Sequence, residues 1–265
     1  MTETASFDSL APGYDQAFTN TLTGREQRAK VHRYLEKVMM SKEQMHILEL
    51  NCGTGTDAIW LSSWGNKVWA TDLSEEMIRM ADRKLSYENN QEVVFRVLSM
   101  NEIDQHFAPY SFDLIFSNFA GFNCLTPDEL KLMNERVHLL LKPHGCLCTI
   151  IFGKSCLWEI LYYLAKLKFG KAFRRWRRFA DAELAAGINQ KLTYFSVSEI
   201  IQSFTHFRLV EKRPVGLFVP PSYLEGFVQK RPGLWRRLVQ WEKKHSSPTL
   251  AGLSDHTYLF FNKRT

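Results

Sequence analysis

The chain has 265 residues, of which 45% are hydrophobic and 23% charged, a balance ordinary for a soluble globular protein that buries a full core. No apolar run reaches the ~20 residues that span a bilayer, and the first residues lack the basic start and apolar stretch of a signal peptide, so a cytoplasmic location is expected. The five scattered cysteines exclude a disulfide framework. The net charge of +6 is concentrated in residues 153–180, which carry eight basic side chains and one acid; the remaining residues sum to −1, which argues against a nucleic-acid-binding protein.

Residues 7–40 carry apolar and aromatic side chains at spacings that fit one or two amphipathic helices. A glycine-rich turn follows the next predicted element, a strand over 46–51. Gly53 and Gly55 lack Cβ atoms, so the backbone there can turn sharply and lie against a ligand. Asp72 ends a second strand, 67–72, and a carboxylate at that point can accept hydrogen bonds from both hydroxyls of a ribose. These residues predict a nucleotide-binding βαβ unit.

The alternation of strands and helices continues, which predicts parallel strands joined by right-handed crossovers. Between the last two predicted strands, no apolar pattern typical of a packed helix would require these strands to run parallel. Further strands are predicted near 93–98, 112–117, 146–152, 207–213 and 256–263, and helices near 56–63, 75–85, 127–140 and 196–204.

In this order the motifs resemble those of the class I S-adenosylmethionine (SAM) dependent methyltransferases. The likeness rests on Glu49 inside the first strand, Asp72-Leu-Ser-Glu-Glu-Met-Ile78, Phe112-Asp-Leu-Ile-Phe-Ser-Asn118 and Leu141-Lys-Pro-His-Gly145. It covers residues 1–152 well and 193–265 more loosely. It implies an α/β, Rossmann-like sheet of seven strands, mostly parallel with a terminal antiparallel hairpin, with helices on both faces and a helical cap.

The resemblance implies SAM as cofactor, S-adenosylhomocysteine as product, and no metal. The glycine turn would line the methionine moiety, Asp72 would bind the ribose, and Tyr14, in a helical cover over residues 1–40, would lie over the cofactor. Asn51 replaces the family's first glycine, and asparagine tolerates a positive φ better than most residues. Ser99 stands where the family often has an acid that meets the adenine. The predicted cofactor-binding residues are Tyr14, Glu49, Asn51, Gly53, Thr54, Gly55, Asp72, Leu73, Met77, Ser99, Met100, Asn101, Ser117, Asn118 and Phe119.

Two stretches, about 153–193 and 214–254, exceed what this fold requires. Both leave the carboxyl end of the sheet, where α/β proteins bind ligands, so we expect one domain, 1–265, with a cap that holds the specificity. Within the first stretch, Lys171–Phe179 is predicted to be a basic amphipathic helix with Phe173 and Trp176 on one face. Residues 166–179 suit contact with an anionic membrane, an acidic carrier or a phosphate, and equally a solvated basic face.

Methyl transfer from a sulfonium requires alignment and exclusion of water, and a base only where the acceptor starts protonated. His256 is the candidate base, because an antiparallel last strand begins at the edge where its neighbours end. Asn123, Glu159, Tyr163 and Tyr194 are the further candidates for the substrate pocket.

The expected function is SAM-dependent methyl transfer to a lipophilic or aromatic small molecule, with oxygen slightly preferred over nitrogen or carbon as acceptor. A nicotinamide-dependent oxidoreductase is an alternative, because the glycine turn also fits the dinucleotide fingerprint. It would need a hydride site such as Tyr-x-x-x-Lys, and no such site is identified in the sequence. A non-catalytic SAM-binding or membrane-associated scaffold is another.

Overall fold

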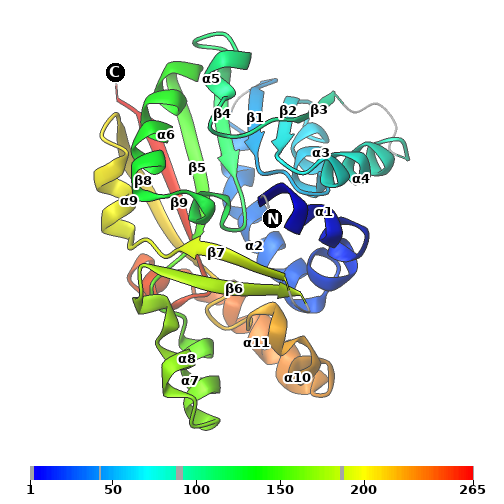
Figure 1. Cartoon of the computed structure of the whole chain (residues 1–265), viewed down its shortest axis with the longest axis vertical. Coiled ribbons are helices and arrows are strands. Elements are labelled where there is room, and N and C mark those ends of the chain that lie inside the picture. The colour runs from blue at the N-terminus through cyan, green and yellow to red at the C-terminus, as the bar shows by residue number, and fades with distance from the viewer. Residues whose placement is uncertain (1–2, 42, 88–91, 186–187, 265) are drawn as a thin grey trace.

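The computed structural model describes residues 3–41, 43–87, 92–185 and 188–264. A sheet of seven strands forms its centre, in the order β3-β2-β1-β4-β5-β9-β8, and β9 runs antiparallel to both neighbours (Figure 1). The predicted Rossmann-like fold class is thereby confirmed. The sheet strands are β1 His46–Leu50, β2 Lys67–Asp72, β3 Val93–Val97, β4 Phe112–Ser117, β5 Leu141–Phe152, β8 Phe207–Val215 and β9 His256–Lys263.

Helices cover both faces of the sheet. One apolar core lies between the sheet and α5, α6 and α9, and the second lies between the sheet and α2, α3 and α4. The helices are α1 Glu3–Tyr14, α2 Leu22–Met39, α3 Thr56–Ser62, α4 Glu75–Leu85, α5 Ile103–His106, α6 Pro127–Leu140, α7 Leu157–Ala165, α8 Phe169–Ala172, α9 Val197–Ser203, α10 Glu225–Gln229 and α11 Pro232–Lys244. None of these described helices is long and apolar enough to cross a membrane.

Local signals explain why the element bounds lie so close to the predicted ones. Ser74 accepts a hydrogen bond from the amide of Met77 and begins α4. A capping box begins α6 and another begins α9. In each, the hydroxyl of a Thr or Ser accepts a hydrogen bond from the backbone amide of a glutamate three residues later, and the carboxylate of that glutamate accepts one from the amide of the Thr or Ser. The one long extension is β5, which begins at Leu141 because that residue already pairs with β4.

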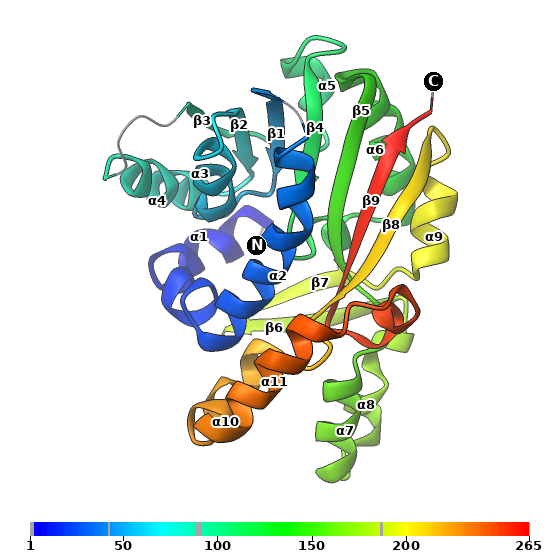
Figure 2. The same cartoon turned by 180° about the vertical axis from the view of Figure 1, so that it is seen from behind.

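The sheet order reverses between β1 and β4, which opens a crevice at the carboxyl ends of the parallel strands. Both long insertions lie at this end. The first contains α7, α8 and a two-stranded hairpin, β6 Phe179–Ala185 and β7 Ile188–Thr193, which the sequence analysis did not predict. The hairpin crosses below the strand ends, and α7–α8 and α10–α11 project beyond it (Figures 1 and 2).

The prediction of one basic helix over Lys171–Phe179 is wrong. Helix α8 ends at Ala172, Arg174–Trp176 forms a 3₁₀ turn, and strand β6 begins at Phe179. The reason is that Arg174 and Arg175 both turn toward the buried carboxylate of Glu159, which a continuous solvent-exposed helix would not allow.

Candidate active site

A cavity of about 580 Å³ lies at the carboxyl ends of the strands. The glycine turn and the end of β2 form one wall, and the start of β9 forms another. Residues of α1 and α2, of the β6–β7 hairpin and of the segment before α10 close it. A smaller polar pocket of about 40 Å³ adjoins it and shares Tyr14, Arg28, Asn51, Gly53 and Phe119 with it.

Asp72 holds the glycine turn against the end of β2. Its Oδ2 accepts a hydrogen bond from the amide of Gly53 at 2.8 Å, and its Oδ1 accepts one from the amide of Ser74 at 3.0 Å. Burial raises the pKa of the Asp72 carboxyl above its ordinary value. The side chain lines the large cavity, so it is positioned to accept hydrogen bonds from a ligand there.

The two glycines of the turn serve different purposes. Both have positive φ, 54° at Gly53 and 74° at Gly55. Gly53 lines both cavities, whereas a Cβ on Gly55 would lie 2.6 Å from the ring of Phe95 and 2.8 Å from the Cβ of Ala81. Gly55 therefore permits close packing of the turn on β3 and α4 rather than contact with a ligand.

Most of the predicted cofactor residues come together. Glu49, Gly55 and Ser117 are the exceptions, since they do not line either cavity in the part of the chain that the structure describes. Burial and the nearby Asp57 raise the pKa of Glu49 well above its ordinary value. The large cavity is lined by Tyr14, Asn51, Gly53, Asp72, Leu73, Met77, Ser99, Met100, Asn101 and Phe119, and the small one also by Thr54 and Asn118.

Asn51 lines both cavities, but its side-chain amide forms hydrogen bonds within the protein. Its φ of 52° confirms the left-handed conformation of the turn. Its Nδ2 donates to the carbonyl of Asn118 at 2.8 Å, and its Oδ1 accepts from the hydroxyl of Ser117 at 2.6 Å. The side chain thus ties the ends of β1 and β4 together across the crevice.

Arg28 of α2 is a site residue that the sequence analysis missed. It is ion-paired with the buried Asp57, which also receives a 2.7 Å contact from Nε2 of His32. Burial alone would lower the pKa of Arg28, but Asp57 raises it. Its Nε has no hydrogen-bond partner among the described residues, and its guanidinium lies 4.8 Å from the ring centre of Phe119. Arg28 lines both cavities, and nothing local distinguishes it from the other arginines of α2.

His256 forms the opposite wall of the large cavity. It begins β9, pairs with the end of β5 and stacks on the ring of Phe152, with ring centres 4.3 Å apart. Its Nδ1 lies 3.4 Å from Oδ2 of Asp255. Burial lowers the pKa of His256 to about 4 despite the opposing effect of Asp255, so the ring is neutral at neutral pH.

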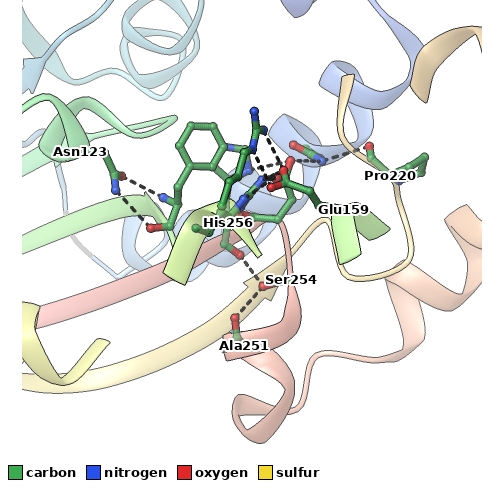
Figure 3. Close-up of polar contacts among 11 residues, drawn as sticks. Asn123, Glu159, Pro220, Ala251, Ser254 and His256 are labelled. Atoms are coloured by element: carbon green, nitrogen blue, oxygen red, sulfur yellow. Dashed lines mark hydrogen bonds and ion pairs between the residues drawn. The ribbon is translucent and has the colours of Figure 1, made fainter. Parts of the chain in front are cut away.

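A charge cluster lies beside His256, and its members Arg174, Arg175 and Asp255 line the same cavity (Figure 3). Arg175 donates to Glu159 at 3.1 Å, and to the carboxylate of Asp255 at 2.7 Å. Arg174 also donates to Glu159, at 2.8 Å. Glu159 is a predicted pocket residue, but it is ion-paired with two arginines and is not among the described lining residues of the cavity.

Of the other predicted pocket residues, Tyr194 lines the cavity, whereas Asn123 and Tyr163 are not among its described lining residues. Asn123 is buried, and its side chain binds the backbone at Phe152 and Thr193, which fastens the insertion to the end of β5 (Figure 3). The sequence analysis identified no Tyr-x-x-x-Lys, but this spacing does occur at Tyr162 to Lys166, where the Oη of Tyr162 accepts from Lys166 at 2.5 Å. The pair lies at the end of α7, and neither residue is among the described lining residues of the cavity.

Comparison with known proteins agrees with this geometry. Residues 47–145 match the methyltransferase domain family. Demethylmenaquinone methyltransferase of Clavibacter sepedonicus is 30% identical over 141 residues, which cover 53% of this chain and 54% of that protein. Malonyl-[acyl-carrier protein] O-methyltransferase of Bacillus cytotoxicus is 28% identical over 211 residues, 76% of this chain and 70% of that protein. The chain spans about half the length of the first curated relatives it matches.

Solved structures share the fold. A protein of Pyrococcus horikoshii superposes with a TM-score of 0.58 at 18% identity and covers 95% of this chain and 98% of that one. A SAM-dependent methyltransferase of Methanosarcina mazei superposes with a TM-score of 0.58 at 19% identity, and the match covers 88% of this chain and 96% of that one. The fold and the crevice thus define an α/β enzyme of the nucleotide-binding type. More specifically, residues 47–145 are similar to the methyltransferase domain family, and the sheet around them has the fold of solved SAM-dependent methyltransferases.

Proposed function

We propose that the protein transfers a methyl group from SAM to an oxygen of a lipophilic or aromatic small molecule, acting in the cytoplasm. The observation that carries this proposal is that one cavity of about 580 Å³ reaches from the glycine turn and Asp72 to His256. Its far part is lined by aromatic side chains, among them Phe152, Tyr194 and Tyr223, which suit an apolar ligand. The relatives named for demethylmenaquinone and for malonyl-[acyl-carrier protein] are consistent with such an acceptor, free or on a carrier.

The residues present fit SAM. Asp72 would accept hydrogen bonds from the ribose hydroxyls, and Tyr14 would cover the cofactor from α1. The unpartnered Nε of Arg28 is a buried donor beside the glycine turn, which suits the carboxylate of the methionine part. When bound, SAM supplies an activated methyl group, and the protein has to orient the acceptor and exclude water.

His256 would accept the proton of the acceptor hydroxyl. Because its pKa is about 4, it is available in the neutral form, yet it is a weak base. A weak base suits an acidic hydroxyl, such as a phenol, better than an aliphatic alcohol. The chemistry therefore favours an aromatic acceptor.

Two measurements test the proposal. Calorimetry is expected to show binding of SAM and S-adenosylhomocysteine but not of NAD. Incubation with methyl-labelled SAM and a panel of phenols and carboxylic acids, read by mass spectrometry, is expected to yield a labelled apolar product. Binding of NAD without SAM would overturn the cofactor, and SAM binding with no transfer to any acceptor would favour the scaffold alternative.

Replacing His256 with glutamine is expected to lower kcat by about 10²–10⁴-fold, the usual contribution of a positioned base, with SAM affinity unchanged. The variant His206→Gln is the control, because that ring contacts Glu135 and stacks on His138, both outside the described lining of the cavity. In the wild type the acidic limb of the rate profile is expected near pH 4. An unchanged kcat in His256→Gln would remove the histidine from the chemistry.

The same histidine is expected to make the fold sensitive to acid. The folded pKa of about 4 lies below the ordinary 6.5, so between these values the unfolded chain binds more protons. This contribution to the free energy of unfolding is complete above pH 6.5 and is lost as the pH falls toward 4. Urea unfolding over that range is expected to show a shallower pH slope for His256→Gln than for the wild type.

A further inference from the structure

Two helical projections extend from the carboxyl end of the sheet. The first projection is α7–α8, residues 157–172, and the second is α10–α11, residues 225–244; both point away from the sheet in the two opposite views (Figures 1 and 2). They meet where Tyr223, just before α10, contacts Tyr162 and Tyr163 of α7 with ring centres 5.9 and 6.3 Å apart. Tyr223 also lines the large cavity, so the projections begin at its wall.

The turn between α7 and α8 exposes large apolar side chains. Leu167 is 76% exposed and Phe169 59% exposed, and Leu167 has a φ of 56°, a conformation that a leucine rarely adopts. Leu161 on the preceding turn of α7 is 55% exposed. Single exposed apolar side chains are ordinary, but two leucines and a phenylalanine exposed on one projection form a patch that suits a binding partner.

Lysines surround this patch. Lys166 and Lys168 flank Leu167, and Lys171 follows on α8; none of the three has an ion pair within the ranges that the structure describes. Most of the other cations of the basic segment are paired: Arg174 and Arg175 with Glu159 and Asp255, and Lys154 and Arg178 with Glu199. Arg177 is the one other cation of the segment without an ion pair among the described residues. Three of the four cations of the segment that have no ion pair among the described residues, Lys166, Lys168 and Lys171, thus lie beside the apolar tip.

The second projection repeats the pattern at its own turn. Phe227 is partly exposed on α10, and the guanidinium of Arg231 lies 4.3 Å from its ring centre. Lys230 precedes this arginine, and Arg236 and Arg237 follow on α11. Each projection therefore carries apolar side chains with basic residues beside them.

We propose that the two projections dock the protein on the surface of an anionic phospholipid bilayer. A protruding leucine and phenylalanine enter the boundary between headgroups and acyl chains, while lysine stems extend their charges back to the phosphates. A folded acidic protein would instead have to offer a groove to each of two separate tips. Docking this way brings the cavity wall at Tyr223 toward the membrane, from which a lipophilic acceptor would enter. The surface itself does not depend on the proposed chemistry.

The charge contribution is tested by sedimentation with vesicles of phosphatidylglycerol and phosphatidylcholine. The variant Lys166→Gln, Lys168→Gln, Lys171→Gln is expected to partition on the order of a hundredfold more weakly than the wild type, since one lysine near an anionic surface is worth about fivefold. The control is Lys37→Gln, Lys131→Gln, Arg208→Gln, which removes three exposed charges away from the projections and is expected to lose little. Wild-type binding should fall with added salt and be weak on phosphatidylcholine alone.

The apolar contribution is tested by Leu167→Ser with Phe169→Ser. This pair is expected to lose vesicle binding at least tenfold, whereas Met40→Ser with Leu132→Ser, at 72% and 53% exposure, is the matched control. Circular dichroism melting checks that each variant is folded, independently of SAM binding. Absence of wild-type binding to anionic vesicles, equal loss in variants and controls, or binding to an acidic acyl carrier protein without vesicle binding would each overturn the proposal.

Discussion

Replacing Arg175 with methionine is expected to destabilise the fold by about 3–5 kcal/mol, the usual cost of removing one partner from a buried ion pair. Arg175 is almost fully buried and donates to Glu159, to the Asp255 carboxylate and to the Asp255 carbonyl at 2.9 Å. Burial would lower the pKa of this guanidinium, but Asp255 and Glu159 raise it well above its ordinary value. Methionine matches the length of the stem but leaves the buried carboxylate of Asp255 without its cation, with Gln27 still donating to it.

Arg177→Met is the matched control, two residues away. Arg177 is exposed and has no ion pair among the described residues, so its replacement is expected to change the free energy of unfolding by less than about 0.5 kcal/mol. Urea unfolding of both variants measures the difference. Equal and small effects would show that the charge cluster is not a structural element of the cavity wall.

Replacing Asp72 with alanine is expected to weaken SAM binding by ~1–3 kcal/mol, or roughly 5- to 150-fold, because the ribose hydroxyls would lose a charged acceptor. The loss has a second source. The amides of Gly53 and Ser74 both donate to this carboxylate, so alanine also releases the glycine turn that lines the cavity. Isothermal calorimetry with SAM and with S-adenosylhomocysteine measures the change.

Asp82→Ala, at an exposed position on α4, is the control and is expected to bind SAM as the wild type does. Asp72→Asn separates the two effects, because the amide oxygen can still accept from one backbone amide but carries no charge. Normal SAM affinity in Asp72→Ala, or loss of the folded state, would show that the residue supports the turn rather than the cofactor.

The sequence predicts the sheet and the glycine turn because both depend on local signals. Strand and helix periodicity, the Ser74 cap and the capping boxes act over a few residues, and they set the bounds of β1 to β4 and of α3, α4 and α6. The positive φ of Asn51 and the acid at the end of β2 are likewise properties of short segments. The order of these segments along the chain then determines the fold class, since parallel strands need right-handed crossovers.

Tertiary structure alone decides which side chains enter the site. Arg28 meets Asp57 across 29 residues, and Arg175 meets Asp255 across 80, so neither pairing leaves a signal in the local pattern. The most basic stretch is predicted to be one amphipathic helix, yet Arg175 is buried in the cavity wall and the helix is interrupted there. A buried carboxylate attracts whichever cation the fold brings near it, because an unpaired charge in the interior is costly, and that proximity exists only once the chain has folded.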